Sequence, residues 1–513
     1  MSIFIGDENE TKAALEEKSS RRIEEKPFRL LLIGNWSNGK NRSDLRERFP
    51  VEIDRDNFDD VLRNFGVELS LDWQSGKQDF VRLRFEEIND FHPDGIYRQI
   101  PLFADLRETR ERLMNPQTFR RAAERLQMFE NDKISSVQKE DKNRFSSSES
   151  QPSDSGDLLE QILSQTAAEP VQKQIPAAGA SDLDNLISRL VKPYLVEIDE
   201  TEQTKLIEAL DEATGQLMRS ILHHPQFKAL ESAWRAASLL VTKIETDSNL
   251  KIYLFDASKE ELAADLKSVN DLSESGFYKL LNGKSFDSAD EESYAVVCGN
   301  YAFKPDVDDV AALMRIAKTA QTSETAFIAQ ASSEILGIES LPGILESGDL
   351  KWDEESSARK LWAMLRALPE SAHIGLTFPR FLGRMPYGTK TDPAESFAFE
   401  EITMPLDSDE YLWLNSSFAC ALLLAQTFAS YEWEIGENFI CDISDLPLYI
   451  YREAGETIIK PVTEAVIRVE AAERIIEQGL MPLITFRDSD TIRLARFQSI
   501  ATPPGLLKGK WNS

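Results

Sequence analysis

Residues 221–235 read ILHHPQFKALESAWR, and this stretch decides how the middle of the chain folds. Pro225 disfavours helical geometry at the residue before it, so we expect one helix to end here and a second to begin. Beyond the proline, apolar residues recur at spacings of three and four, as on the buried face of an amphipathic helix. These residues are Phe227, Leu230, Trp234 and Ala237. The stretch therefore predicts a corner between two packed helices.

The same stretch holds two of the four histidines of the chain, His223 and His224. Neighbouring helical residues diverge by about 100°, so these two cannot both face one metal ion as residues four apart can. The other two, His92 and His373, have no cysteine or carboxylate at ligand spacing. We therefore predict structural or surface roles for all four histidines, with no metal site and no cofactor.

The composition indicates a multidomain protein with real hydrophobic cores. The chain has 513 residues, of which 42% are hydrophobic, and at about 150 residues per domain this length suggests two to four domains. The longest apolar run, 418–428, is shorter than the roughly 18 residues of a membrane helix. The acidic N-terminus lacks the order of a secretory signal, and three widely spaced cysteines suit a reducing compartment. We expect a cytoplasmic protein without a membrane span.

The formal net charge of the chain is −30. An acidic surface repels phosphate backbones, so we predict that nucleic acid is not a partner. Acidity also confers solubility and can set complementarity within an assembly.

Changes of composition along the chain predict its domains. Residues 1–25 are polar and predicted to be flexible, and residues 26–130 form a first domain. Residues 131–156 have few large apolar side chains and are predicted to be a disordered linker. Residues 157–500 form a second domain, helical over 157–245 and mixed over 246–500, and 501–513 form a tail.

The expected elements mix strands and helices. The first domain contains a buried strand at 28–33, a short helix at 58–65, a hairpin from 67–71 and 81–85, and a helical pattern over 93–129. In the second domain, strands at 250–256, 294–298, 326–329 and 374–378 alternate with helices at 308–320, 356–368, 415–431 and 466–478, and a hairpin surrounds Gly455. This alternation predicts an α+β fold with mixed α/β layers.

Residues 34–41 read GNWSNGKN and match the phosphate-binding pattern GxxxxGK after a buried strand. A phosphate-binding loop needs Ser or Thr next, followed by an amphipathic helix. Asn41 stands at that position, and Trp36 is large for a loop that wraps phosphate. We therefore favour a polar loop and keep an NTPase using residues 34–40 as the less favoured alternative. The chain has no GxSxG or HExxH motif, and we predict a non-enzymatic protein without catalytic residues.

Residues 378–388 read FPRFLGRMPYG and place two arginines in a loop beyond a strand end. Such a loop could hold an anion, or its arginines could pair with the abundant carboxylates. We favour pairing, and we predict that Arg380, Arg384 and Tyr387 contribute to an interface.

Many blocks of the chain, in collinear order, resemble the two contractile-sheath subunits of the bacterial type VI secretion system. Residues 27–130, called here the N-terminal segment, resemble the small subunit. Residues 157–500, the C-terminal segment, resemble the large subunit. The N-terminal blocks are PFRLLLIGNW, VEIDRDNFDDVLRNFGVELSL and FEEINDFHPDGIYRQIPLFADLRETRERL. The C-terminal blocks are ILHHPQFKALESAWR, NLKIYLFDASKEEL, YAVVCGNYAF, HIGLTFPRFLGRMPYG, FAFEE, YLWLNSSFACALLLAQTFASYEW and GLMPLITFRDSD.

The resemblance implies a contractile tail-sheath-like fold and a mechanical function. In that family the two subunits interlock and stack as a helical sheath around an inner tube made of a separate protein. The sheath assembles on baseplate proteins, and its contraction drives the tube into a target cell. A Clp-type AAA+ unfoldase recycles the contracted sheath through a helix of the large subunit. The matching residues here are Leu158, Leu159, Ile162 and Leu163.

Two departures from the family pattern stand out. The subunits are usually separate chains, whereas here a single chain joins both, which makes the unfoldase helix internal. Large subunits also usually continue further, whereas this chain ends with ATPPGLLKGKWNS. The expected function is therefore a sheath component that self-associates or joins other sheath subunits, and the alternative is a baseplate-adjacent or capping adaptor with a sheath-derived fold.

Overall fold

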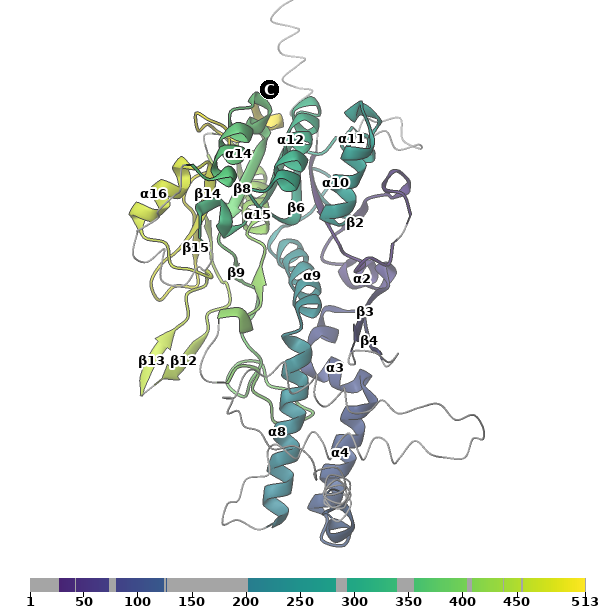
Figure 1. Ribbon diagram of the computed structural model, residues 1–513. Helices are drawn as coiled ribbons and strands as arrows, with labels where there is room; N and C mark the ends of the chain where they lie inside the picture. The colour runs from purple at the N-terminus through teal and green to yellow at the C-terminus, as the bar shows by residue number, and fades with distance from the viewer. Residues whose placement is uncertain are drawn as a thin grey trace, which may run out of the picture. The chain divides into compact units, whose positions relative to one another are not determined.

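The computed structural model describes residues 27–41, 43–72, 80–123, 126, 202–282, 293–338, 355–403, 408–436, 438–453 and 455–512. The chain divides into two compact units (Figure 1). Unit 1 comprises Met1–Val67, Ala229–Met385 and Asp407–Ser513, and unit 2 comprises Glu68–Lys228 and Pro386–Leu406. Each unit therefore contains residues of both the N-terminal and the C-terminal segment.

Unit 1 is built around a nine-stranded sheet with the order β11-β15-β14-β8-β7-β6-β1-β5-β2 (Figure 1). Its strands are β1 (Phe28–Gly34), β2 (Val51–Ile53), β5 (Leu250–Asp256), β6 (Val296–Phe303), β7 (Ala326–Ala331), β8 (Ile374–Phe378), β11 (Asp442–Ile443), β14 (Leu480–Thr485) and β15 (Ile492–Leu494). The strands from β14 to β5 run parallel, and β2, β11 and β15 pair antiparallel at the two ends. The central strands are apolar on both sides, as expected for a sheet covered on both faces.

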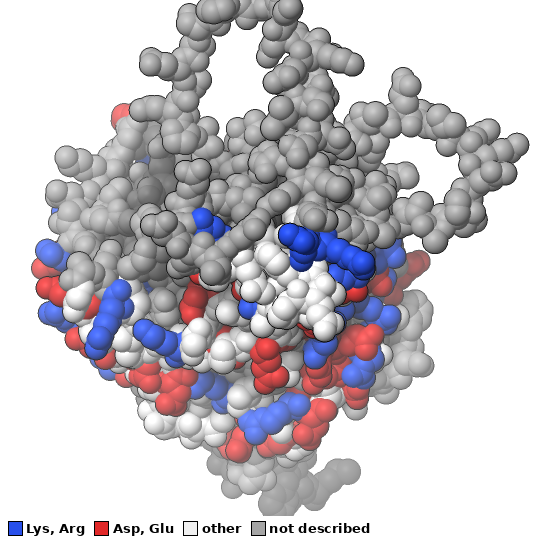
Figure 2. Space-filling view, turned by 90° about the horizontal axis from the view of Figure 1, so that it is seen from below, with Lys and Arg blue, Asp and Glu red and all other residues white. Residues whose placement is uncertain are grey.

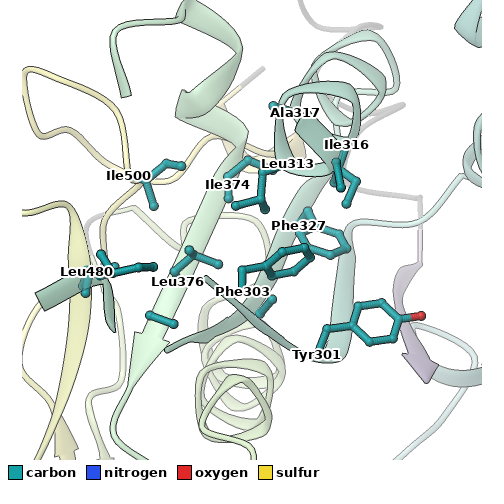
Figure 3. Close-up of a cluster of buried hydrophobic side chains, with 14 of the residues drawn as sticks. Tyr301, Phe303, Leu313, Ile316, Ala317, Phe327, Ile374, Leu376, Leu480 and Ile500 are labelled. Atoms are coloured by element: carbon teal, nitrogen blue, oxygen red, sulfur yellow. The ribbon is translucent and has the colours of Figure 1, made fainter. Parts of the chain in front are cut away.

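Helices pack on both faces of this sheet. One face carries α10 (Lys259–Ser268), α11 (Gly276–Leu281), α12 (Val307–Thr322), α14 (Ser357–Arg366) and α16 (Val469–Glu477). Leu313 and Ile316 of α12 lie over Phe327 of β7 in the main hydrophobic core (Figure 3). The opposite face carries α15 (Ser417–Tyr431), which packs against β1, β6, β7 and β8. Successive residues of a strand point to opposite faces, so Val297 joins the α12 core while Cys298 contacts Ser417 of α15.

Smaller elements complete unit 1. They are α2 (Phe58–Phe65), the strand pair β9 (Phe381–Leu382) and β10 (Trp413–Leu414), and the hairpin of β12 (Ile450–Glu453) and β13 (Glu456–Ile459). The described residues also form short 3-10 helices in both units: η1 (Leu45–Glu47), η2 (Ile88–Phe91), η4 (Leu272–Glu274), η5 (Ser333–Leu336), η6 (Pro369–His373), η7 (Ser408–Glu410) and η8 (Lys510–Asn512).

Unit 2 is mainly helical. It contains α3 (Pro93–Gln99), α4 (Pro101–Met114), α8 (Glu202–Leu222) and the start of α9 (Pro225–Lys243), which continues into unit 1. Prolines occupy the first positions of α3 and α4, where the missing amide proton has no helical partner to lose. The strands β3 (Val67–Asp72) and β4 (Phe80–Phe85) pair with each other, and α4 packs against α8.

The helix break predicted before Pro225 is confirmed, because α8 ends at Leu222 and α9 begins at Pro225. The four residues predicted for the buried face of α9 are all 3% exposed or less. The predicted strand at 28–33 and the hairpin around Gly455 are also confirmed.

Three local expectations need correction. The strand predicted at 294–298 begins at Val296 and continues to Phe303, because Gly299 and Asn300 are a strand irregularity with a register shift and do not form a turn. The helical pattern over 93–129 breaks at Ile100, before Pro101, and again at Asn115. The segment expected to be a tail is packed, since Leu507 is fully buried and the amide of Lys508 donates to Ala372 O at 2.8 Å.

Candidate assembly interface

Strand β1 of the N-terminal segment lies between two strands of the C-terminal segment. It pairs in parallel with β5 on one side and with β6 on the other. Leu30, Leu31, Leu32 and Ile33 are fully buried, and complete burial of such a side chain stabilises a fold by about 1.5–3 kcal/mol. Without β1, both β5 and β6 would present an open edge, so the two segments form one continuous sheet.

The apolar face of α9 is the second contact between the segments in unit 1. The ring centroid of Trp234 lies 5.5 Å from that of Trp36, 5.9 Å from Phe58 and 5.7 Å from Phe65, all edge-on. The indole Nε1 of Trp234 also donates to Trp36 O at 3.1 Å. The face that the sequence predicts as buried is therefore covered by aromatic side chains of the N-terminal segment.

Phe227, at the start of the same helix, makes the corresponding contact in unit 2. Its ring centroid lies 5.9 Å from that of Phe85 and 5.8 Å from that of Phe91, while Phe85 and Phe91 stack on each other at 4.1 Å. Edge-on aromatic pairs of this kind add about 0.5–1.5 kcal/mol beyond the area that they bury. The stretch at 221–235 thus packs against the N-terminal segment in both units.

The loop at 34–40 binds a carboxylate of its own chain. Asp256, at the end of β5, accepts hydrogen bonds from the amides of Trp36 (2.8 Å) and Ser37 (3.1 Å) and from the Ser37 hydroxyl (2.5 Å). The ammonium of Lys40 donates to Gly66 O at 2.9 Å. No α-helix follows the loop directly; the next element is the three-residue η1. Two backbone amides and one hydroxyl of this loop therefore serve Asp256, and the Lys40 ammonium serves Gly66 O.

Polar contacts join the segments in unit 2. The guanidinium of Arg110 on α4 pairs with both carboxylate oxygens of Asp211 on α8, at 2.6 and 3.0 Å. The carboxylate of Asp94 accepts the amides of Glu395 and Ser396, each at 2.9 Å. Burial disfavours the charged form of Asp94, but these amide donors outweigh it and lower the pKa of the carboxyl.

The expectation that Arg380 and Arg384 pair with carboxylates is confirmed within the chain. Nε of Arg380 donates to Glu464 Oε2 at 2.8 Å, and its Nη2 contacts the other oxygen of the same carboxylate. Nε of Arg384 donates to Glu231 Oε1 at 2.7 Å, and Arg235 binds the same oxygen at 2.7 Å. Contact of Arg380 and Arg384 with another subunit stays a prediction.

Tyr387, the third predicted interface residue, lies in unit 2 and is 1% exposed. Its amide donates to Glu401 Oε2 at 2.8 Å, and its ring contacts the ring of His92 edge-on at 4.8 Å. Its role at an interface also stays a prediction. The helix predicted to contact the unfoldase, with Leu158, Leu159, Ile162 and Leu163, lies outside the described residues.

Nucleophilic side chains of β6 and β8 form buried contacts with serines at the start of α15. Cys298 contacts the Ser417 hydroxyl at 3.3 Å, and the Thr377 hydroxyl donates to the Ser416 hydroxyl at 2.8 Å. All four side chains are fully buried, and burial raises the pKa of the Cys298 thiol to about 12. Throughout the described ranges, no cluster of three or more His, Cys, Asp or Glu side chains is arranged to hold a metal ion.

The hairpin of β12 and β13 offers backbone groups at its edges. In the part of the chain that the structure describes, β12 and β13 form a sheet of two strands only. The ammonium of Lys460, at the base of the hairpin, lies 4.7 Å from the ring centroid of Tyr411 and 5.7 Å from that of Trp413. Ile450 of β12 is 52% exposed. An isolated hairpin is marginally stable in water and gains from a third strand.

Charge on the described surface is mixed. On the face that Figure 2 shows, basic and acidic side chains intermingle over the coloured part of the surface. A mixed surface supports contacts of short range with a partner of matching pattern. No helix among the described elements has the length and apolar character that a membrane span requires.

Comparison with known proteins connects this interlocked arrangement to a family. Residues 204–501 match the family described as EvpB/VC_A0108, tail sheath N-terminal domain, and residues 12–144 match the family described as type VI secretion system, VipA, VC_A0107 or Hcp2. The chain is also similar to the type VI secretion system sheath protein TssC1 of Pseudomonas aeruginosa, with 34% identity over 304 residues. That alignment covers 58% of this chain and 61% of the relative, so less than two thirds of the relative's length is matched. The predicted resemblance to both sheath subunits is confirmed, and the chain belongs to the EvpB/VC_A0108 tail sheath family.

Proposed function

We propose that this chain is a structural component of the sheath of a type VI secretion system or of a related contractile injection system. In this role it assembles around an inner tube in an extended state and drives ejection of the tube by contraction. The printed name of the Pseudomonas aeruginosa relative, a type VI secretion system sheath protein, supports this role. Conversion between two packings of a cooperative lattice needs no active site, so the chain works without catalysis and without a cofactor.

The observation that carries the proposal is the position of β1. A strand of the small-subunit-like segment pairs on both sides with strands of the large-subunit-like segment. In the proposed role, one folded chain therefore supplies both halves of a sheath building block. Fusion fixes a one-to-one ratio of the two segments and raises their effective concentration.

The β12–β13 hairpin is the contact that we propose for joining copies. In an antiparallel pair, hydrogen-bonded and open residue pairs alternate. The Lys460 amide donates to Tyr449 O, and the register pairs Arg452 with Thr457, so the amides of Arg452 and Thr457 point away from the hairpin. Outward amides of this kind can donate hydrogen bonds to the carbonyl groups of a strand that a neighbour adds to the hairpin.

The remaining partners follow from the resemblance. The inner-tube protein lies inside the assembled sheath, and baseplate proteins nucleate it. A Clp-type AAA+ unfoldase recycles the contracted form through Leu158, Leu159, Ile162 and Leu163. Such an assembly resides in the cytoplasm.

Negative-stain electron microscopy of the purified chain, alone and with its inner-tube partner, tests the proposal. We expect rings or tubes of regular width, with assembly promoted by the inner-tube protein. Isolated monomers under all conditions would contradict a polymerising sheath component. Monomers that recover baseplate proteins and no inner-tube protein in a pull-down would instead support the baseplate-adjacent or capping adaptor.

A further inference from the structure

The loop at 386–401 in unit 2, called here the clasp loop, is closed by its own ends. The amide of Glu401 donates to Tyr387 O at 2.9 Å. The amide of Tyr387 donates to the Glu401 carboxylate at 2.8 Å. Both residues are almost fully buried, so the two ends of the loop form a fixed base.

The clasp loop binds both segments. From the N-terminal segment, Asp94 accepts the amides of Glu395 and Ser396, and the ring of Tyr97 stacks on Phe397 at 5.1 Å. From the C-terminal segment, Arg219 of α8 donates to Glu400 O at 3.0 Å. The loop therefore connects α3 and α8 through contacts that it makes with each of them.

Two of the four histidines of the chain face acidic residues of this loop. Nε2 of His223 lies 3.8 Å from Glu401 Oε1, and the Glu401 side chain is 2% exposed. Nε2 of His92 lies 3.6 Å from Asp392 Oδ1, at an exposed position. The two histidines come from different segments, yet both lie next to the same loop.

We propose that the clasp loop is a proton-sensitive contact that docks more tightly when His223 is positively charged. Imidazole side chains change charge between about pH 5 and 8. A positive charge at His223 attracts the buried Glu401 carboxylate where solvent screening is weak. The added stabilisation is present at mildly acidic pH and is lost as the pH rises through the imidazole titration.

The other charged groups around the two histidines modulate this effect. Arg219, one turn before His223, faces the same loop, and Glu212 binds its guanidinium at 2.6 Å. The carboxylate of Glu400 accepts the amide and hydroxyl of Thr389. On the other side, the Asp94 carboxylate lies 3.4 Å from His92 Nδ1. Glu212 therefore offsets the charge of Arg219, and the carboxylates of Glu401, Asp392 and Asp94 lie within 4 Å of a ring nitrogen of the two histidines.

The consequence of this contact rests on the proposed function: mild acidification would tighten the connection between the two sheath segments and favour the state in which they are clasped. The contact itself requires no polymer. It can fail while the sheath role stands, and the sheath role can fail while the contact titrates.

Hydrogen exchange followed by mass spectrometry on the purified full chain, at pH 6 and pH 8 and corrected for intrinsic exchange rates, tests the proposal. We expect protection of peptides from 386–401 to be about fivefold higher at pH 6, the size of a partly exposed ion pair. His223→Gln and Glu401→Gln should each remove most of this difference, and Glu401→Gln keeps an acceptor for the Tyr387 amide. His224→Gln is the matched control, because His224 instead accepts the amide of Gln226.

Equal protection of the clasp loop at both pH values in the wild-type chain would overturn the proposal. So would a pH difference that persists in both His223→Gln and Glu401→Gln. A variant that merely unfolds is distinguished by loss of protection across α4 and α8 at both pH values. In that case, His223→Asn, another change at the same contact, provides the second measurement and should also remove most of the pH difference.

Discussion

Glu231 lies fully buried on α9, between the guanidinium groups of Arg384 and Arg235. Burial disfavours the ionised carboxyl, but the two arginines outweigh it and lower the pKa of Glu231. The cluster ties the residues after β9 to α9, and so fixes the helix whose apolar face receives the N-terminal segment.

We expect Glu231→Gln to lower the free energy of unfolding by about 3–5 kcal/mol, because removing one partner of a buried ion pair leaves the other charge uncompensated. Urea denaturation followed by tryptophan fluorescence measures the change. Glu473→Gln, at an exposed position on α16, is the control and should change stability by less than about 0.5 kcal/mol. Equal losses in the two variants would contradict a structural role of the cluster.

The difference in stability between wild type and Glu231→Gln should also depend on pH. A carboxyl whose pKa is lowered by folding contributes stability above its ordinary pKa of about 4.3, and the contribution is lost as the pH falls through the folded pKa. The difference in unfolding free energy between wild type and Glu231→Gln should stay constant from about pH 6 to 8 and shrink below about pH 4. A difference that is unchanged in acid would assign the loss to packing.

The three cysteines should react with a thiol reagent in a fixed order. Burial raises the pKa of Cys298 to about 12 and that of Cys420 well above its usual value, and both are fully buried, whereas Cys441 is half-buried. Reaction requires the thiolate and access. We expect Cys441 to be modified first in the native chain, and the other two only on unfolding, as peptide mapping after timed labelling will show. Early labelling of Cys298 would contradict the buried network around Ser417.

At the residue scale, the sequence predicted that the arginines of 378–388 bind carboxylates but did not identify which carboxylates. The arginines of 378–388 were expected to pair with carboxylates, and they do. Glu231, however, lies 153 residues before Arg384, and no local pattern selects it among 88 acidic residues. Its place beside Leu230, on the border of the buried face of α9, was the one available hint.

At the element scale, the β12–β13 hairpin allows a precise test of strand addition. Thr457→Pro removes an amide that points outward from the hairpin and leaves the ladder bonds of its neighbours in place. We expect this variant to fold, with a thermal midpoint close to that of wild type, and to lose assembly in negative-stain micrographs. Thr457→Ala keeps the amide and is the control. Assembly of Thr457→Pro at wild-type yield would exclude this edge as the contact between copies.

Periodicity located most elements of unit 1 because each is decided by neighbours in the sequence. α12 and β8 begin and end within a residue or two of their predicted ranges. The strand predicted at 294–298 stopped before Gly299, whereas β6 continues to Phe303 and pairs with β1 on one side and β7 on the other. The extent of β6 depends on its pairing with neighbouring strands, which is set by the tertiary structure and not by the local sequence.

At the scale of the whole molecule, the two segments should stay together without a covalent connection. We expect a chain with a specific protease site inserted between residues 131 and 156 to remain one particle after cleavage, because both units contain contacts between the segments. Size-exclusion chromatography measures the particle, and the fragments should separate only in denaturant. Leu31→Asp, which places a charge in the buried centre of β1, is the contrasting variant and should release fragments. Release from the cleaved wild-type chain would contradict the interlock.

The collinear resemblance predicted which sheath subunits the chain combines and in which order. It did not predict that each compact unit draws on both segments. That arrangement depends on the pairing of β1 with β5 and β6. The periodicity within β1 predicts a strand but does not predict which distant strands pair with it.

The central position of β1 also delays completion of the nine-stranded sheet during synthesis. Phe28 pairs with Leu250, so at roughly 5–20 residues per second the ribosome needs about 10–45 s to supply the first neighbour of a strand that it has already made. During that time an apolar strand with two open edges is exposed to other nascent chains, a known route to misassembly. Production of this protein should therefore be limited by what protects residues 28–34 during synthesis more than by the stability of the finished sheet.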